Sequence, residues 1–239
     1  MPFLRFHFYR VGSTHQKARE LLNDGVRPPF VVQAELQEAG RGRYGRTWYS
    51  PPGGLWFTVV FPATPPERFV RVTVFAAEAV ARVLETARVR EVRIKVPNDL
   101  VLQGRKIGGV LGEWDPRAAL LGIGLNTRVR GFPEEVRARA GSVEQLGGVA
   151  LKHPELLQRI LDHLNALYEA VLQERDQSWY QAWHRRLLGL GKRVRFGYPP
   201  LGQTIKGIFE GVTPRFELRV DGALYDLAQV KDFREVPGD

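Results

Sequence analysis

Residues 55–61 limit the fold of this chain more than any other segment. Their sequence, Leu-Trp-Phe-Thr-Val-Val-Phe, places apolar side chains on both faces of an extended strand. Such a strand is stable at the centre of a sheet that is covered on both faces. The segment therefore predicts a layered domain in which helices pack on a sheet. A chain of 239 residues is long enough to bury that core and to add a smaller domain.

The apolar residues outside this segment repeat at both helical and strand spacings. Helices are predicted from a cap at Ser13 or Thr14 to Gly25, over 74–84, and from Pro154, where one apolar stripe combines Leu157, Ile160, Leu161, Leu164, Leu167, Tyr168 and Val171. Further strands are predicted at 3–9, 31–34, 89–94, 100–102, 107–111 and 120–125, with a hairpin turn at 103–105. The strands outnumber the helices too far for a regular doubly wound sheet, so the expected class is α+β, a mixed β-sheet with packed helices.

The character of the sequence changes after Leu188. Gly189-Leu190-Gly191 is followed by four short β-rich segments that glycines and prolines separate, at 193–196, 204–210, 216–220 and 224–227. This pattern is typical of a small all-β barrel. We therefore expect a first domain over residues 1–189 and an SH3-like β-barrel domain over residues 190–239.

The charge of the chain raises the question of a nucleic-acid partner without answering it. The formal net charge is +9 and the pI is near 10.1, which suits a nucleic acid, an acidic protein or a phosphate-bearing substrate. The cations are spread along the sequence, and arginine far outnumbers lysine, a skew that a GC-rich genome also produces. Charge alone therefore does not select a function.

The absence of cysteine and of long apolar runs excludes several classes of protein. Without cysteine the chain forms no disulfide, no thiolate metal site and no cysteine nucleophile. No apolar run approaches the roughly 20 residues that span a bilayer, and the first residues lack the layout of a secretion signal. These observations predict a cytoplasmic protein without a membrane segment.

Residues 40–48 are the most informative segment, Gly-Arg-Gly-Arg-Tyr-Gly-Arg-Thr-Trp, and Ser-Pro-Pro-Gly-Gly-Leu follows at 50–55. Glycines let the backbone approach a ligand, while Arg41, Arg43 and Arg46 offer guanidinium groups to a carboxylate or a phosphate. The pattern is neither a P-loop nor the dinucleotide fingerprint. Taken alone, it is better interpreted as a mobile basic surface loop or an arginine–glycine segment that binds RNA.

Two further segments place polar residues at the ends of predicted strands. Lys95-Val-Pro-Asn-Asp99 precedes Lys106-Ile-Gly-Gly109, and Gly122-Ile-Gly-Leu-Asn126 follows. Lys106 lies among apolar residues and glycines, although most strand lysines are solvated edge residues. Asn126 by itself is an ordinary turn residue.

In combination and in this order, these segments resemble the biotin–protein ligase family. The family's motifs occur in this order: the glycine–arginine loop followed by Trp and Ser-Pro-x-Gly-Gly-Leu, then Lys-Trp-Pro-Asn-Asp, Lys-[Ile/Leu]-x-Gly and Gly-x-x-x-Asn. Upstream of them, Ser13-Thr14 and Gln37 match further positions of the family. The resemblance runs from about residue 5 to the C-terminal barrel. The chain departs from the family at Val96, where Trp is usual, at His15, where Asn is common, and over 226–232, which matches loosely.

The resemblance implies an enzyme that activates biotin with ATP as biotinyl-5′-AMP and transfers it to a lysine of a biotin carboxyl carrier protein. It implies Lys106, Arg41 and Arg43 as catalytic residues, with the glycine–arginine loop closing over the adenylate. The biotin contacts it implies are Ser13, Thr14, His15, Gln37, Arg41, Gly42, Arg43, Lys106, Gly108 and Gly109, the last two leaving room for the biotin rings. Arg46, Trp48, Asn98 and Asn126 are the implied nucleotide contacts, with Trp48 stacking on adenine.

The same resemblance implies Mg²⁺ bound largely through phosphate oxygens, with no dedicated protein ligands, and it is compatible with a homodimer. A lipoate or octanoyl transferase shares the fold and a strand lysine, but gives no reason for this glycine–arginine loop. A nucleic-acid-binding module predicts aromatic residues on one basic face instead. Only 12 residues precede Ser13, too few for a helix-turn-helix module, so we expect no sequence-specific DNA binding.

Overall fold

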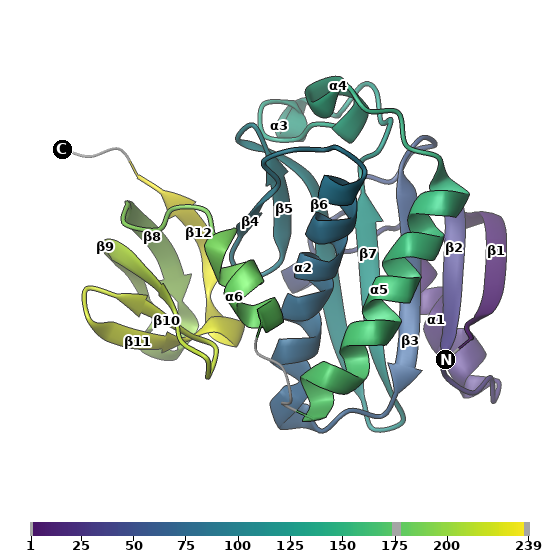
Figure 1. The fold of residues 1–239 in the computed structure, drawn as a ribbon, viewed down its shortest axis with the longest axis horizontal. Coiled ribbons are helices and arrows are strands. Elements are labelled where there is room, and N and C mark those ends of the chain that lie inside the picture. Colours follow the sequence, from purple (N-terminus) through teal and green to yellow (C-terminus); the bar gives the residue numbers. More distant parts are fainter. Residues whose placement is uncertain (1, 174–177, 237–239) are drawn as a thin grey trace.

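A seven-stranded mixed sheet forms the frame of the first domain in this computed structural model, which describes residues 2–173 and 178–236 (Figure 1). Its strand order is β1-β2-β3-β7-β6-β5-β4, and only β1 and β2 run parallel. The strands are β1 (Leu4–Val11), β2 (Phe30–Gln37), β3 (Leu55–Pro62), β4 (Arg93–Lys95), β5 (Asp99–Leu102), β6 (Arg105–Asp115) and β7 (Ala118–Leu125). Strand β3 pairs with β2 on one side and β7 on the other, so the predicted interior strand is confirmed.

Helices cover both faces of this sheet. The long helices α2 (Phe69–Thr86) and α5 (His153–Gln173) pack side by side on one face, and α1 (Thr14–Asn23) lies on the other (Figure 1). Three shorter helices are α3 (Glu134–Arg137), α4 (Val143–Gly147) and α6 (Ser178–Arg185). None of the described helices is long and apolar enough to cross a membrane. The side chains of Leu167 and Val171, predicted to lie on the apolar stripe of α5, fall outside the described residues.

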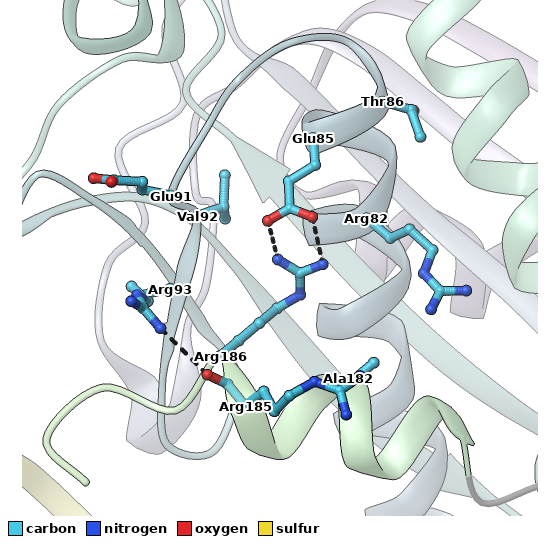
Figure 2. A pocket seen from close by; sticks show the side chains of 9 residues that line it. All are labelled: Arg82, Glu85, Thr86, Glu91, Val92, Arg93, Ala182, Arg185 and Arg186. Carbon is cyan, nitrogen blue, oxygen red and sulfur yellow. Dashed lines mark hydrogen bonds and ion pairs between the residues drawn. The ribbon is translucent and has the colours of Figure 1, made fainter.

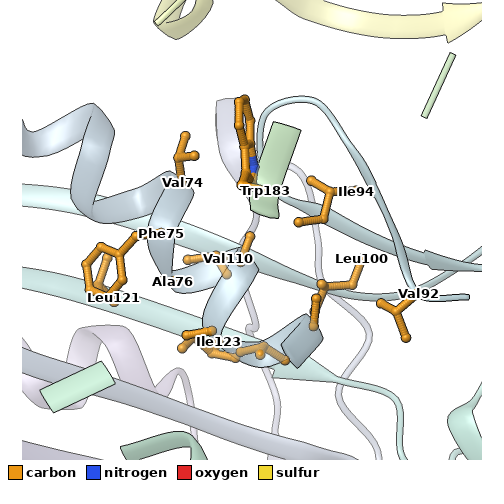
Figure 3. Packing of buried hydrophobic residues seen from close by; sticks show 14 of the residues in the cluster. Val74, Phe75, Ala76, Val92, Ile94, Leu100, Val110, Leu121, Ile123 and Trp183 are labelled. Atoms are coloured by element: carbon orange, nitrogen blue, oxygen red, sulfur yellow. The ribbon is translucent and has the colours of Figure 1, made fainter. Parts of the chain in front are cut away.

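Alternation along the central strands divides the core between the two faces. Phe57 and Leu121 belong to the large cluster under α2 and α5, where Figure 3 shows Leu121 beside Phe75. Val60 and Leu120 belong to the smaller cluster under α1. Because neighbouring strand residues point to opposite faces, a segment that is apolar throughout can fill both clusters.

A five-stranded antiparallel sheet forms the second domain, in the order β11-β10-β9-β8-β12. Its strands are β8 (Arg193–Tyr198), β9 (Gln203–Val212), β10 (Glu217–Val220), β11 (Ala223–Asp226) and β12 (Lys231–Glu235). Phe196, Phe209, Leu218 and Phe233 are buried in it. The expected all-β character is therefore confirmed. The boundary expected near residue 190 falls in the connection between α6 and β8.

The strand predicted over 89–94 is wrong in most of its length, because β4 covers only Arg93–Lys95. Arg88 and Glu91 have φ angles of 70° and 60°, which turn the chain twice after α2. Val89 and Val92 are nevertheless buried, and Val92 packs in the same cluster as Leu100 (Figure 3). Buried β-branched residues favour a strand by pattern, but here they lie in the loop that connects α2 to β4. The hairpin predicted at 103–105 does join β5 to β6.

Candidate functional site

Three glycines on neighbouring strands form the floor of the candidate site, on the face of the sheet that carries α1. Gly109 of β6 pairs directly with Gly124 of β7, and Gly122 lies two residues before it. A Cβ atom would stand 3.4 Å from Lys106 Cε at Gly109, 2.9 Å from His15 Nδ1 at Gly122 and 2.5 Å from Trp48 Nε1 at Gly124. Each glycine thus makes room for one side chain that the sequence placed in the site.

Gly108 does not contribute to this floor. A Cβ atom there would stand 3.0 Å from Leu125 Cδ1 and 3.1 Å from Leu100 Cδ1, both buried in the cluster under α2 and α5. The prediction that Gly108 opens space beside the ligand is therefore wrong, because alternation along β6 turns it to the opposite face from Gly109.

A buried polar network ties the start of α1 to the end of β2. Gln37 Oε1 accepts hydrogen bonds from the backbone nitrogen of Thr14 (2.8 Å) and from its hydroxyl (3.0 Å). Gln37 Nε2 donates to Ser50 Oγ at 2.8 Å, and the Thr14 hydroxyl lies 3.0 Å from that of Thr58 on β3. A Cβ atom at Gly40 would stand 2.7 Å from Ser50 Oγ, so the entry to the glycine–arginine loop depends on this residue being glycine. The network fixes Thr14 and Gln37 before any ligand binds.

His15, the residue after Thr14 on α1, is 8% exposed. Ser13 caps the helix by accepting a hydrogen bond from the His15 backbone nitrogen at 3.2 Å. His15 Nε2 lies 2.7 Å from Glu113 Oε2, and the other oxygen of that carboxylate pairs with Arg19. Burial, assisted by the positive charge of Arg19, lowers the pKa of His15 to about 4, so the ring is neutral near pH 7.

Lys106 is held over the glycine floor by an anion and an aromatic ring. Its Nζ lies 2.6 Å from Asp99 Oδ1 and 4.9 Å from the centre of the Trp48 ring. Strand β6 is an interior strand between β5 and β7, so the alternative of an exposed edge-strand lysine is wrong. The Lys106 side chain keeps 35% exposure, which leaves its ammonium accessible to a substrate.

A second lysine stands near Lys106, and the sequence analysis did not select it. Burial, with the positive charges of Lys106 and Arg139, lowers the pKa of Lys95, while Asp99 and Asp232 act in the opposite direction. The positive charges around Lys95 therefore come from two parts of the sequence, the segment with Lys95 and Lys106, and Arg139. Lys95 begins the quoted Lys-Val-Pro-Asn-Asp segment, and only the fold brings Arg139 and Asp232 to it.

The two predicted asparagines are both buried and both bonded to the backbone. Asn98 is 3% exposed, and its side-chain amide donates to the carbonyl oxygen of Val110. Asn126 is 4% exposed, and its Nδ2 donates to the carbonyl oxygens of Gly141 (3.1 Å) and Lys106 (3.4 Å). These contacts hold the strand ends that surround Lys106. Their predicted nucleotide contacts stay a prediction.

The glycine–arginine loop contacts the second domain through its arginines. Arg43 Nη2 donates to the carbonyl oxygens of Ala228 (3.1 Å) and Val230 (3.3 Å), and Arg46 forms an ion pair with Asp232. Tyr44 also donates its hydroxyl to the Val230 carbonyl, at 3.2 Å. Arg41 is exposed, and Gly42 is partly buried with its nitrogen bonded to the Arg46 carbonyl at 2.7 Å. Residues 228–232, which match the family only loosely, therefore form the contacts of the second domain with this loop.

A cleft of about 630 Å³ lies away from this site, between the end of α2, strand β4 and α6 (Figure 2). It contains none of the predicted site residues. Its central cation, Arg186, donates to Glu78 Oε2 and to Glu85 Oε2, each at 2.7 Å. Glu78 is 1% exposed, and burial raises its pKa, while Arg186 opposes that rise. The charge of Arg186 is therefore already paired within the protein. Its bonds join the end of α6 to α2.

Comparison with known proteins connects the geometry to a family of ligases. The model of the Biotin/lipoate A/B protein ligase family matches residues 7–128. Biotin--[acetyl-CoA-carboxylase] ligase from Mycobacterium tuberculosis is 32% identical over 206 residues, covering 83% of this chain and 74% of that protein. The enzyme of the same name from Paracoccus denitrificans is 30% identical, covering 85% and 88%. The bifunctional ligase/repressor BirA of Bacillus subtilis is 30% identical, and the chain spans 63% of its length.

Solved structures extend the likeness to the second domain. Biotin protein ligase from Aquifex aeolicus in complex with biotin and ATP superposes with a TM-score of 0.85 over 98% of this chain and 99% of that one, at 24% identity. Biotin protein ligase from Leishmania major in complex with biotinyl-5-AMP has a TM-score of 0.65 at 25% identity, covering 95% and 99%. Both domains of this chain therefore have counterparts in these proteins.

Proposed function

Because this chain belongs to the Biotin/lipoate A/B protein ligase family, we propose that it is a biotin–protein ligase that forms biotinyl-5′-AMP and passes biotin to a lysine of a carrier protein. One observation carries the proposal furthest. The ammonium of Lys106 lies over the glycine floor, on the same face of the sheet as the Thr14–Gln37 network. A cation beside a small enclosed polar corner suits a substrate with a polar ring at one end and a carboxylate at the other.

In the first step, a carboxylate oxygen of biotin attacks the α-phosphorus of ATP, and the bond from that phosphorus to pyrophosphate breaks. Both reactants are anions, so a cation must offset their repulsion. Lys106 supplies this positive charge. The lowered pKa of Lys95, caused by burial and by the nearby charges of Lys106 and Arg139, reflects the same gathering of cations. In the second step, the neutral amine of an acceptor lysine attacks the acyl carbon, AMP leaves, and the amine loses a proton.

The remaining site residues take roles that their positions support. Arg41 and Arg43 lie on a loop that closes over the adenylate and excludes water, which protects a readily hydrolysed anhydride. Trp48, seated on Gly124, offers an aromatic face to adenine, and Arg46, Asn98 and Asn126 contact the nucleotide.

Magnesium would be held mainly by phosphate oxygens, where it would neutralise charge on the triphosphate. Asp99 is the carboxylate beside Lys106. Within the part of the chain that the structure describes, no three His, Asp or Glu residues gather as a metal site.

The proposed acceptor is the biotin carboxyl carrier protein of acetyl-CoA carboxylase, in keeping with the names of the Mycobacterium and Paracoccus relatives. A homodimer is also proposed, on the resemblance and on the position of β1 at the end of the sheet order. Size measurement of the purified protein with and without ligands tests this second point.

Pyrophosphate exchange into ATP tests the proposed activity directly. Exchange that requires biotin, and that lipoate does not support, is the expected result. Mass spectrometry of a carrier domain incubated with ATP and biotin should then show the mass of one biotin, gained on one lysine. Exchange with lipoate in place of biotin would assign the chain to the other branch of the family instead.

A further inference from the structure

Three cations stand side by side on the outer face of the second domain, one on each of three neighbouring strands. Arg195 of β8 is the direct cross-strand partner of Arg234 on β12 and of Lys206 on β9. Because Val194 and Phe196 are both buried, alternation turns the Arg195 side chain between them away from the core. Neighbouring strands lie about 4.8 Å apart, so the three residues span about 10 Å. We call them the cationic row.

The cationic row has no acidic partner within the part of the chain that the structure describes. None of its three side chains forms a hydrogen bond or an ion pair with a described residue. Two carboxylates of the same domain are bonded elsewhere: Asp221 Oδ1 accepts the Ile208 backbone N–H at 2.9 Å, and Asp232 pairs with Arg46. Like charges in directly opposite strand positions destabilise a sheet. An anionic partner would remove that repulsion.

The cationic row begins beside the contact between the second domain and the glycine–arginine loop. Asp232, two residues before Arg234 on β12, forms the ion pair with Arg46 of that loop. The bond to Arg46, and to a smaller extent the charge of Arg234, lowers the pKa of Asp232, so Arg234 lies close to this contact. Figure 1 shows β12 between the first domain and β8. A protein that brings a lysine to an adenylate under this loop therefore comes next to the row.

An exposed apolar side chain beside the row favours a protein over a nucleic acid as the partner. Ile208, two residues after Lys206 on β9, lies on the same outer face and is 40% exposed. Protein interfaces combine arginine with apolar contacts, whereas single-stranded nucleic acids bind to aromatic platforms. The aromatic residues of β8, β9 and β12 alternate with the row and point to the other side of the sheet: Phe196, Tyr198, Phe209 and Phe233.

We propose that the cationic row of Arg195, Lys206 and Arg234 is the surface on which an acidic face of the carrier domain docks while its lysine reaches the adenylate. The inference rests on the proposed function, because that function supplies the protein acceptor. Charges along the approach to a site raise the rate of encounter and orient the partner. The row thus gives the outer face of the second domain a task in the choice of acceptor.

Transfer to a biotin carrier domain, measured at saturating biotin and ATP, tests the row in the complete protein. We expect Arg195→Glu to lower kcat/KM for the carrier roughly 10-fold or more, mainly through KM, and Lys206→Glu to act in the same direction. Biotin-dependent pyrophosphate exchange, which needs no carrier, should stay at the wild-type level in both variants. Added salt should lower kcat/KM more steeply for the wild type than for Arg195→Glu.

Arg219→Glu is the matched control, because it makes the same change of charge in the same domain. Arg219 pairs with Gly211, which lies five residues, or about 17 Å, along β9 from Lys206. Its kcat/KM for the carrier should stay close to the wild-type value. Arg195→Glu should melt no lower than the wild type, since an anion then stands between two cations. A loss of transfer in that variant is therefore separate from any loss of folding.

Two results would overturn the inference. Wild-type kcat/KM for the carrier in both Arg195→Glu and Lys206→Glu, with normal exchange, would remove the row from acceptor docking and leave the proposed ligase intact. Binding of single-stranded DNA that Arg195→Glu abolishes, with unchanged transfer to the carrier, would assign the row to a nucleic acid instead. Absence of biotin-dependent exchange in the wild-type protein would reject the proposed function itself, and the inference with it.

Discussion

The side chain of Arg43 donates a hydrogen bond to the carbonyl oxygen of Val230, 187 residues later in the sequence, at 3.3 Å. Lys231, the next residue, places its Nζ 4.2 Å from the centre of the Tyr44 ring. The loop that is proposed to cover the adenylate therefore rests on the second domain. Its order depends on contacts that cross between domains.

Loss of the Arg46–Asp232 ion pair should loosen this loop without destabilising the fold. Both side chains are more than half exposed, and exposed pairs contribute only about 0–1 kcal/mol. We expect Asp232→Asn to leave the free energy of unfolding nearly unchanged but to speed hydrogen exchange over residues 42–48. Asp115→Asn, which weakens the ion pair with Arg117 at the turn between β6 and β7, is the control and should leave that exchange unaltered. Equal exchange in all three proteins would show that the ion pair does not order the loop.

Lys106→Ala should separate catalysis from stability. The Lys106 side chain is partly exposed and makes a single described ion pair, so its removal should lower the melting temperature little. Loss of a preorganised cation should slow adenylate formation roughly 100-fold or more in a single turnover. Lys152→Ala, which removes an exposed lysine from a surface pair with Glu155, should retain both rate and melting temperature. A normal adenylation rate in Lys106→Ala would leave the arginines to do this work.

Gly124→Ala should displace Trp48 from the floor of the site. The new methyl group would stand 2.5 Å from Trp48 Nε1, closer than any real contact, so the indole must move. We expect ATP to bind more weakly, measured by calorimetry, with a loss of about 1–3 kcal/mol in unfolding free energy. Gly12→Ala is the matched control, because nothing lies within 4 Å of a Cβ atom there. Unchanged ATP affinity in Gly124→Ala would argue against stacking on Trp48.

Acid should destabilise the protein partly through His15. The pKa of His15 falls from 6.5 to about 4 on folding, so between these values the unfolded state binds more protons and stability decreases as pH falls. The contribution is complete above pH 6.5, and about 3 kcal/mol of it is lost by pH 4. His153, His163 and His184 also have lowered pKa values and act in the same direction.

The difference between wild type and His15→Asn isolates this residue from the other three. Urea unfolding between pH 4 and pH 7 should show a shallower slope of unfolding free energy against pH in the variant. Parallel curves for the two proteins would mean that His15 titrates normally in the folded state.

Glu78→Ala should be among the most destabilising single changes. It leaves Arg186, whose side chain is 14% exposed, without its buried partner, and removing one member of a buried pair costs about 3 kcal/mol or more. Glu85→Ala removes the other partner of the same guanidinium, but Glu85 is 39% exposed, and we expect a loss below about 1 kcal/mol. Urea unfolding of both variants provides the comparison. Similar losses of unfolding free energy in the two variants would show that burial does not determine how much each ion pair stabilises the fold.

Much of the fold could be predicted because it follows from local patterns. Apolar residues on both faces of 55–61 indicated an interior strand, and the change after Leu188 indicated an all-β second domain. The strand predicted at 89–94 was wrong over most of its length, because an apolar, β-branched pattern does not distinguish a strand from a buried loop. The two left-handed residues that turn this loop, Arg88 and Glu91, carry no glycine or asparagine signal.

The candidate site could be predicted in part, because its motifs are contiguous in sequence. Lys106, Gly109 and Trp48 lie together as expected, whereas Gly108 faces the core. Glu113 could have been found by alternation, since it lies four residues after Gly109 on the same strand and thus on the same face.

The sequence by itself determined the elements and the chemical types of the site, since periodicity and motif order are properties of neighbouring residues. Only the tertiary structure decided which groups meet. Arg43 reaches Val230, Lys95 comes near Asp232, and His15 rests on Gly122. Charges and hydrogen bonds act over a few ångströms in space, whatever the separation along the chain. A pKa or a free lone pair therefore becomes defined only when folding has chosen its neighbours.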